Sequence, residues 1–255
     1  MNLAEIVTRM EITLHHIGYD LKQTVDDLGQ IERFEKRSRG DTFDINEHVK
    51  GMILALLSNQ RPWKPIMQNM TKITEIFLNF QVEKLKQADK RLLAEQLKGI
   101  KCGNRAIDKQ LASLDFNLSV FEQIELDYGS LDKYVISDSP IDIAWELAKG
   151  KKYKLKQIGF ALALEYLRNV GIQAIKPDLH LRRIISKNRL NLYPGYPSEI
   201  DTYRILSTIS KEANVSLTYI DNLMWVFCAT DYANVCGSNP KCHICQLQDN
   251  CNMAT

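Results

Sequence analysis

Four cysteines near the end of this 255-residue chain have the type and spacing to bind a metal. Five residues separate Cys236 from Cys242, two separate Cys242 from Cys245, and five separate Cys245 from Cys251. Zinc bound by four thiolates usually sits between two Cys-x-x-Cys pairs. A single central Cys-x-x-Cys with longer gaps on both sides is more typical of the ligands of one [4Fe–4S] cluster. The spacing therefore favours an iron–sulfur cluster, with a zinc ion, disulfides and free thiols as the alternatives.

The surroundings of these cysteines favour a bound metal over disulfides. The stretch 234–255 loses helical periodicity and has too few apolar residues for a core of its own, so something else must order it. The chain has no apolar signal segment and no apolar run long enough to span a bilayer. We therefore expect a cytoplasmic or nucleoid-associated protein, in which disulfides are rare. The other two cysteines, Cys102 and Cys228, are expected to be buried as small apolar side chains.

Positive charge is concentrated in one block of the chain. Between residues 149 and 190, eleven basic residues face only Glu165 and Asp178, although the whole chain has a formal net charge of +2. Such an excess attracts polyanions and releases counterions from a phosphate backbone. On charge alone, a solvated lysine-rich loop is nearly as good an explanation as a nucleic-acid site. The basic residues are Lys149, Lys151, Lys152, Lys154, Lys156, Arg168, Lys176, Arg182, Arg183, Lys187 and Arg189.

Two segments of the chain resemble a known family. The cysteine tail is similar to the cluster loop of the endonuclease III family, although its first gap is one residue shorter than is usual there. The segment 155–163, LKQIGFALA, resembles the helix-hairpin-helix signature of the same superfamily. In that motif a tight hairpin and a helix N-terminus offer backbone N–H groups to a DNA phosphate. The resemblance implies an all-helical DNA glycosylase with a mainly structural [4Fe–4S] cluster.

The hairpin segment departs from the family pattern at one position. Gly159 is retained, and Ile158 is the apolar residue expected at the tip, but Gln157 replaces the first hairpin glycine. A left-handed backbone there would cost a non-glycine residue about 1–2 kcal/mol. The resemblance implies DNA contacts by Ile158, Gly159 and the nearby Lys154 and Lys156. The alternative is a plain helix start after a lysine-rich loop.

A carboxylate follows the hairpin at the family's distance. Residues 178–183, DLHLRR, are similar to the family's Asp-x-His-x-x-Arg segment, which implies that Asp178 is catalytic. Cleavage of an N-glycosidic bond builds positive charge on the sugar, and a fixed anion stabilises that charge and can orient or deprotonate water. His180 and Arg182 are then expected to contact phosphate or to support Asp178. The structural alternative is a helix N-cap, and the two roles are compatible.

Two further positions bear on the reaction. Family members that also nick the strand have a lysine where this chain has Ala161, and that lysine forms a Schiff base with the sugar. The change implies a monofunctional glycosylase, with a non-catalytic DNA-binding protein on the same scaffold as the alternative. Residues 56–60, LLSNQ, resemble a helix end of endonuclease III whose glutamine fills the space of the flipped base, so Gln60 is the expected wedge. A surface helix end is the alternative there.

The elements that position these residues are expected to be helices. Apolar residues recur at spacings of three and four, and no bounded period-two alternation occurs, so an all-α fold is predicted. Ser198, after a Pro- and Gly-rich cluster, is expected to cap the helix that follows. Helices are expected at 3–38, 44–58, 65–88, 91–98, 104–115, 118–126, 140–148, 160–170, 179–187, 199–211 and 216–230.

The resemblance also implies two helical lobes. We expect a six-helix barrel lobe with the hairpin motif at 44–172, and an iron–sulfur cluster lobe at 1–43 plus 173–255, with DNA in the cleft between them. The expected partner is double-stranded DNA containing a damaged or mispaired base, bound by a monomer without membrane attachment. A zinc-stabilised helical module with no nucleic-acid partner is a further alternative.

Overall fold

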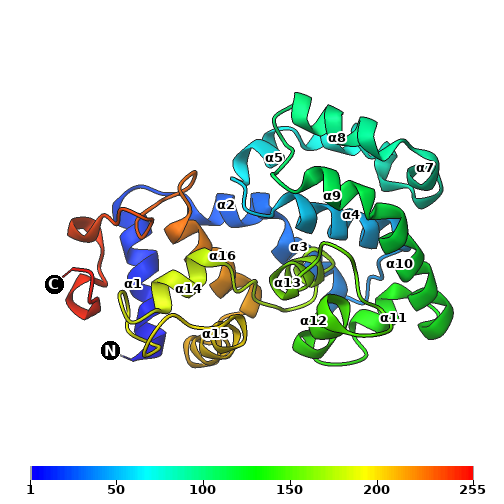
Figure 1. Ribbon diagram of the computed structural model, residues 1–255. Coiled ribbons are helices and arrows are strands. Elements are labelled where there is room, and N and C mark those ends of the chain that lie inside the picture. Colours follow the sequence, from blue (N-terminus) through cyan, green and yellow to red (C-terminus); the bar gives the residue numbers. More distant parts are fainter. Residues whose placement is uncertain (1, 255) are drawn as a thin grey trace. The chain divides into compact units, whose positions relative to one another are not determined.

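The structure is a computed structural model that describes residues 2–254. Every regular element in this range is a helix and none is a strand, which confirms the predicted all-α class (Figure 1). The chain forms two compact units. We call Arg33–Ile172 the hairpin unit, and Met1–Glu32 together with Gln173–Thr255 the tail unit. No helix in the described range is long and apolar enough to cross a membrane.

The hairpin unit is built on a packed pair of helices, α4 (Ile45–Leu57) and α13 (Phe160–Asn169), with α12 (Pro140–Lys149) also against α13. Gly51 permits the close approach of α4, because a Cβ atom there would lie 2.9 Å from Val170 Cγ1. The remaining elements are the second half of α3 (Gln30–Ser38), α5 (Lys64–Gln68), α6 (Met70–Ile76), η1 (Leu78–Phe80), α7 (Val82–Gln87), α8 (Lys90–Gly99), α9 (Ile107–Ala112), α10 (Leu114–Tyr128) and α11 (Leu131–Val135).

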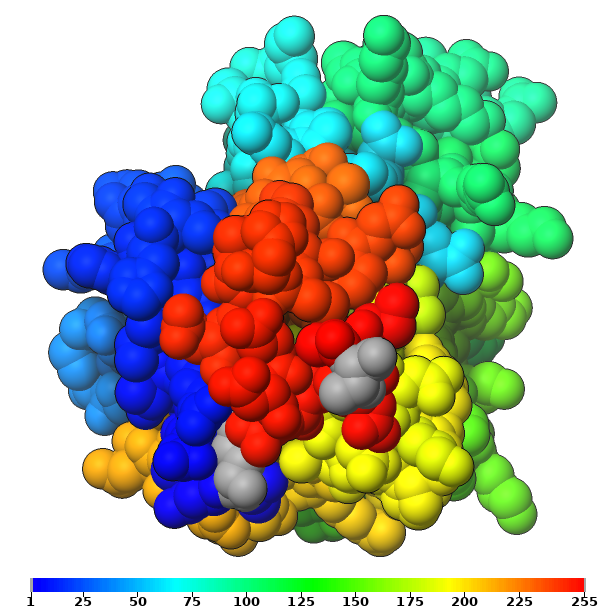
Figure 2. Space-filling view, turned by 90° about the vertical axis from the view of Figure 1, so that its left-hand side faces the viewer, coloured from blue at the N-terminus to red at the C-terminus, as the bar shows by residue number. Residues whose placement is uncertain are grey.

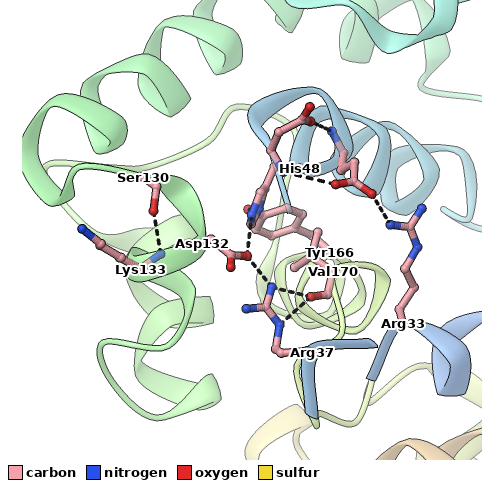
Figure 3. Close-up of polar contacts among 10 residues, drawn as sticks. Arg33, Arg37, His48, Ser130, Asp132, Lys133, Tyr166 and Val170 are labelled. Carbon is pink, nitrogen blue, oxygen red and sulfur yellow. Dashed lines mark hydrogen bonds and ion pairs between the residues drawn. The ribbon is translucent and has the colours of Figure 1, made fainter. Parts of the chain in front are cut away.

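A buried polar cluster holds four of these helices in register (Figure 3). His48 Nδ1 lies 2.7 Å from the Tyr166 hydroxyl, and His48 Nε2 lies 3.3 Å from Asp132 Oδ1. Arg37 donates to the same Asp132 oxygen at 2.6 Å and to the Val170 carbonyl at 2.8 Å. Burial lowers the pKa of His48 more than Asp132 raises it, so His48 is neutral at pH 7. Because Arg37 belongs to this cluster, the unit begins at Arg33, before the predicted lobe start at residue 44.

The tail unit packs its first helix against its last ones. α1 (Leu3–His16) lies against α15 (Glu199–Ala213) and α16 (Leu217–Cys228), while α2 (Leu21–Leu28) and α14 (Leu179–Ile185) also contact α16. The buried apolar side chains of α1 are Ile6, Val7, Met10 and Leu14. Two short turns, η2 (Cys242–Ile244) and η3 (Gln248–Asn250), are the only regular elements after α16 within the described residues.

The helix α1 also anchors the cysteine tail. Arg9 donates to the Gln246 carbonyl at 3.2 Å, and Gln246 N–H donates to Thr13 Oγ1 at 3.0 Å. Figure 2 shows the C-terminal segment (red) lying against the first helix (blue). Most of this tail is irregular, so these side-chain contacts hold it where regular backbone pairing does not.

Two of the long predicted helices are wrong, because each is several shorter ones. The prediction at 3–38 is broken by Gly18 and Gly29, both with left-handed backbone (φ 68° and 74°), into α1, α2 and α3. The prediction at 65–88 is interrupted at η1, where Leu78, Asn79 and Phe80 all have φ between 53° and 59°. The apolar spacing runs on through these breaks, so periodicity alone did not reveal them.

Candidate functional site

The four tail cysteines line one pocket. Its empty volume is about 270 Å³ including its open side, and its other walls are Arg189, Val235, Pro240, Gln248, Met253 and Ala254. No group of three or more His, Cys, Asp or Glu side chains in residues 2–254 is placed to hold a single metal ion. The structure thus brings the four tail cysteines to the wall of one pocket.

A buried positive charge faces this pocket. Arg189 is only 6% exposed, and its Nη1 has no hydrogen-bond partner, while Nη2 donates to the Gly237 carbonyl at 3.4 Å. A hydrogen bond from the Cys228 thiol lowers the pKa of Cys236 to about 7 against the effect of burial, and Arg189 and Arg183 add to the lowering. The first cysteine of the tail is therefore poised to be a thiolate.

Cys228 is buried as predicted, and it also touches the tail. The Phe227 carbonyl accepts hydrogen bonds from Val235 N–H at 2.8 Å and Cys236 N–H at 3.0 Å, which brings Cys236 beside the end of α16. Cys102, also fully buried, lies in the hairpin unit and donates its thiol to the Pro65 carbonyl at 3.5 Å. Cys102 therefore belongs to a different core from the pocket.

Asp178 is the N-cap of α14. Its Oδ1 accepts from His180 N–H at 2.8 Å and from Leu181 N–H at 3.2 Å, so the structural role expected of an Asp after a Pro is present. Within the described residues no hydrogen bond reaches Oδ2. The side chain is partly exposed, and Leu179 beside it is 62% exposed. One carboxylate oxygen is thus fixed by the helix while the other is free for a ligand.

A chain of contacts connects this carboxylate to the cysteine pocket. Arg183 Nη2 lies 3.2 Å from His180 Nδ1 and donates to the Cys236 carbonyl at 3.2 Å. Burial lowers the pKa of His180 although Asp178 raises it, so His180 is neutral near pH 7 and Nδ1 accepts from Arg183. The sequence assigned no role to Arg183, although it occupies the arginine position of the Asp-x-His-x-x-Arg pattern.

Arg182 has a local structural role in the tail unit. Its Nε donates to the Pro197 carbonyl at 2.9 Å, and its guanidinium lies 4.6 Å from the centre of the Tyr196 ring. These contacts fix the loop that precedes Ser198, the N-cap of α15, as expected for that serine. A DNA contact by Arg182 stays a prediction.

The hairpin between α12 and α13 keeps a left-handed residue at Gln157, despite the cost of that conformation to a non-glycine residue. Gln157 has φ +61°, the left-handed conformation that the missing glycine would favour. The Asn117 side chain binds both backbone groups of Lys156, accepting from its N–H at 2.8 Å and donating to its carbonyl at 3.0 Å. At the start of α13, Gly159 has no side-chain cap and open space where a Cβ would lie. The first N–H groups of α13 are therefore accessible to an outside acceptor.

The side chains of the hairpin divide into buried and exposed ones. Ile158 is 4% exposed, so its side chain anchors the hairpin and only its backbone can meet a ligand. Lys154 and Lys156 are exposed on the same loop. Ala161 stands in the first turn of α13 and is partly exposed.

The left-handed backbone at Gln157 leads to a stability prediction. Gln157→Gly should raise the melting temperature by about 2–4 °C, because relief of about 1–2 kcal/mol of strain exceeds the added chain entropy of glycine. Gln157→Val should lower it, since a branched Cβ tolerates positive φ worst. Thermal unfolding of the full chain measures both. A lower melting temperature for the glycine variant would contradict the strain at this position.

Gln60 follows α4 at an exposed, left-handed position with φ +49°. The next residue, Arg61, donates to the Gly103 carbonyl, with Nη1 2.6 Å from the oxygen. The Asn104 and Gln110 side chains donate to the Leu56 carbonyl at 2.8 and 3.3 Å, which closes the end of α4. The backbone on both sides of Gln60 is therefore fixed while its side chain points to solvent, as a wedge requires.

Comparison with known proteins finds similar structures. The 8-oxoguanine glycosylase/lyase of Methanocaldococcus jannaschii, solved with DNA containing 8-oxoguanine, matches 88% of this chain and 96% of its own at 20% identity, with a TM-score of 0.57. The 8-oxoguanine DNA glycosylase of Thermotoga maritima matches 88% and 96% at 18% identity (TM-score 0.58). An endonuclease III–DNA covalent intermediate matches 88% and 93% at 17% identity (TM-score 0.55).

At these identities the likeness concerns the fold. No protein-family model matches the chain, and no curated protein sequence matches it significantly. The all-helical fold expected from the hairpin and tail motifs is confirmed, because the chain shares the fold of these solved structures over nearly their whole length.

Proposed function

We propose that this chain, on the fold that it shares with those glycosylases, hydrolyses the N-glycosidic bond of a damaged or mispaired base in double-stranded DNA. The proposal rests on the carboxylate of Asp178, in which Oδ1 accepts from two backbone N–H groups and Oδ2 is free to meet a ligand. A plain cap needs one oxygen only. Because Oδ1 is held, the free Oδ2 has a fixed position, and a fixed anion stabilises the positive charge that the reaction builds on the sugar.

In the proposed mechanism each unit has its own task. The hairpin unit binds a phosphate at the open start of α13, while Gln60 supports the strand from which the base has left. In the tail unit Asp178 stabilises the cationic sugar and orients or deprotonates the attacking water. His180, neutral and fixed by Arg183, adds no positive charge beside the developing cation.

A panel of lesion-containing duplexes tests the activity. Labelled duplexes with 8-oxoguanine, oxidised pyrimidines, uracil or mismatches are incubated with the purified chain and then treated with alkali, which cuts abasic sites. The panel starts with 8-oxoguanine because two of the similar structures are named for it. We expect base release from at least one duplex. Binding to these duplexes without release of any base would contradict the proposal.

The residue at position 161 gives a second test. Because alanine has no amine, wild type should leave the strand intact until alkali is added, whereas Ala161→Lys should cut it directly and be trapped covalently on DNA by borohydride. Ala161→Met is the matched control, with similar length and no amine. Strand cleavage by wild type without alkali would show that another amine forms the Schiff base, and the monofunctional assignment would fail.

We also propose that Cys236, Cys242, Cys245 and Cys251 hold a [4Fe–4S] cluster. The residues fit such a group, because four thiolates ligate one cluster and all four cysteines line one pocket. The unpartnered Nη1 of the buried Arg189 fits the net negative charge of a cluster bound by four thiolates. Zinc would draw the four sulfurs to one ion and is the alternative. When bound, the cluster supplies a cross-link that orders the tail.

The second candidate function is a non-catalytic DNA-binding protein. Ala161 favours it, since a scaffold that has lost one catalytic group can have lost the reaction. The cap made by Asp178 would then account for that side chain completely. The lesion panel separates the two, because a binder retains affinity for the duplexes and releases no base.

A further inference from the structure

The hairpin is flanked by two exposed aromatic rings, and a lysine lies on each. Lys156 Nζ lies 3.9 Å from the centre of the Phe116 ring, and Lys149 Nζ lies 4.4 Å from the centre of the Trp145 ring. Both rings are 43% exposed, although neither belongs to the hairpin sequence itself. Each exposed ring thus has a cation on its face, at a distance at which the ring attracts the ammonium group.

The first ring is part of a double clamp from α10. Asn117 binds both backbone groups of Lys156, and the preceding Phe116 lies under the ammonium group of the same lysine. Neighbouring residues of one helix thus fix the main chain and the side chain of Lys156. The second ring is tied to the start of α13, because Trp145 packs edge-on against the buried Phe160 with ring centres 6.1 Å apart.

Neither ammonium group is neutralised by a carboxylate. Within the described residues Lys149 and Lys156 form no ion pair, and the acidic residues next to the two rings in the sequence have other partners. Asp115, next to Phe116, pairs with Lys90 at 2.6 Å. Glu146, next to Trp145, accepts hydrogen bonds from the backbone N–H groups that follow α12. The two rings therefore hold ammonium groups that form no ion pair with a carboxylate of the described residues.

We propose that Phe116 and Trp145 are positioning residues that hold Lys156 and Lys149 in place for the phosphates of bound DNA. Lysine is flexible, and binding of a free lysine costs side-chain entropy. A ring that already restricts the ammonium group lowers that cost, and a phosphate next to it completes the neutralisation. The inference rests on the proposed function, since it names the groups with which the hairpin unit binds the DNA backbone.

A double-mutant cycle tests the pairing. Affinity is measured by fluorescence anisotropy on a duplex with a tetrahydrofuran abasic site, which has no base to release, at several salt concentrations. Lys156→Met should weaken binding several-fold and reduce the slope of log affinity against log salt by about 1. Phe116→Leu should weaken binding about 2–5-fold with the slope unchanged, and should have no further effect in the Lys156→Met background. In the second pair, Lys149→Met should behave like Lys156→Met, and Trp145→Leu should behave like Phe116→Leu.

Two control variants lie away from the rings and their lysines. Leu126→Ala, at an 80% exposed site on α10, and Lys84→Met on α7 should leave affinity unchanged. Equal melting temperatures exclude misfolding as the cause. If Phe116→Leu weakens binding as much without Lys156 as with it, the ring acts by itself and the inference fails while the proposed function stands. If wild type binds no duplex at all, both fail.

Discussion

Asp178→Asn is expected to reduce base excision by about 10²–10⁴-fold without changing the affinity for DNA or the melting temperature. Asparagine retains a side-chain oxygen that can accept from His180 N–H and Leu181 N–H, so the cap of α14 survives. The substitution removes only the negative charge and the basic oxygen. Single-turnover excision on the lesion found in the panel measures the rate, with alkali to reveal abasic sites.

The companion variant is Asp178→Ala, which removes both the charge and the cap. It should lose the same activity and in addition about 0.5–2 kcal/mol of stability. The pair separates chemistry from structure, because only the alanine variant should melt earlier. Excision by Asp178→Asn at the wild-type rate would mean that the carboxylate is a cap and nothing more.

Local features of the fold were largely predictable from the sequence. Ser198 and Asp178 follow prolines at the start of apolar periodic segments, and both are N-caps in the structure. These features are decided within one helical turn, where the sequence contains all the interacting groups.

Helix breaks that leave the apolar spacing intact were not predictable. Residues 78–80 are apolar or amide side chains in an apolar segment, yet all three have positive φ. Asparagine tolerates this conformation and is the one hint that the sequence offers. At the break the buried Phe77 and Phe80 stack with their ring centres 5.8 Å apart. The spacing of apolar residues along the sequence does not predict such packing.

The candidate site shows the same division between local and distant information. Arg182 and Arg183 are adjacent, but successive residues on a helix point about 100° apart. Arg182 therefore reaches Pro197, while Arg183 reaches His180 and the cysteine tail. Which arginine faces the tail depends on residues more than fifty positions away. Local sequence patterns likewise cannot predict the contact between Arg9 and Gln246, which are 237 residues apart.

Loss of one tail cysteine should remove the metal and destabilise the tail unit. Cys245→Ala is expected to abolish nearly all bound iron and to lower the melting temperature by roughly 10 °C, because a ligand cross-link is folding free energy. Burial raises the pKa of Cys245 to about 11, so its thiol is a poor anion unless a metal displaces the proton. Without that bond the segment around Gln246 keeps its hydrogen bonds to α1 and the buried side chain of Leu247 but loses its cross-link to the other cysteines.

Iron, sulfide and zinc analysis of the purified chain distinguishes the outcomes. Four irons with matching sulfide and visible absorbance would support the cluster, whereas one zinc per colourless chain would support the alternative. Cys102→Ala is the control, because Cys102 is a fully buried thiol of the hairpin unit and does not line the pocket. It should retain the metal even if it loses some stability. Full metal content in Cys245→Ala would overturn the assignment, because the four tail cysteines are the only thiols that line the pocket in the described residues and none is left to replace Cys245.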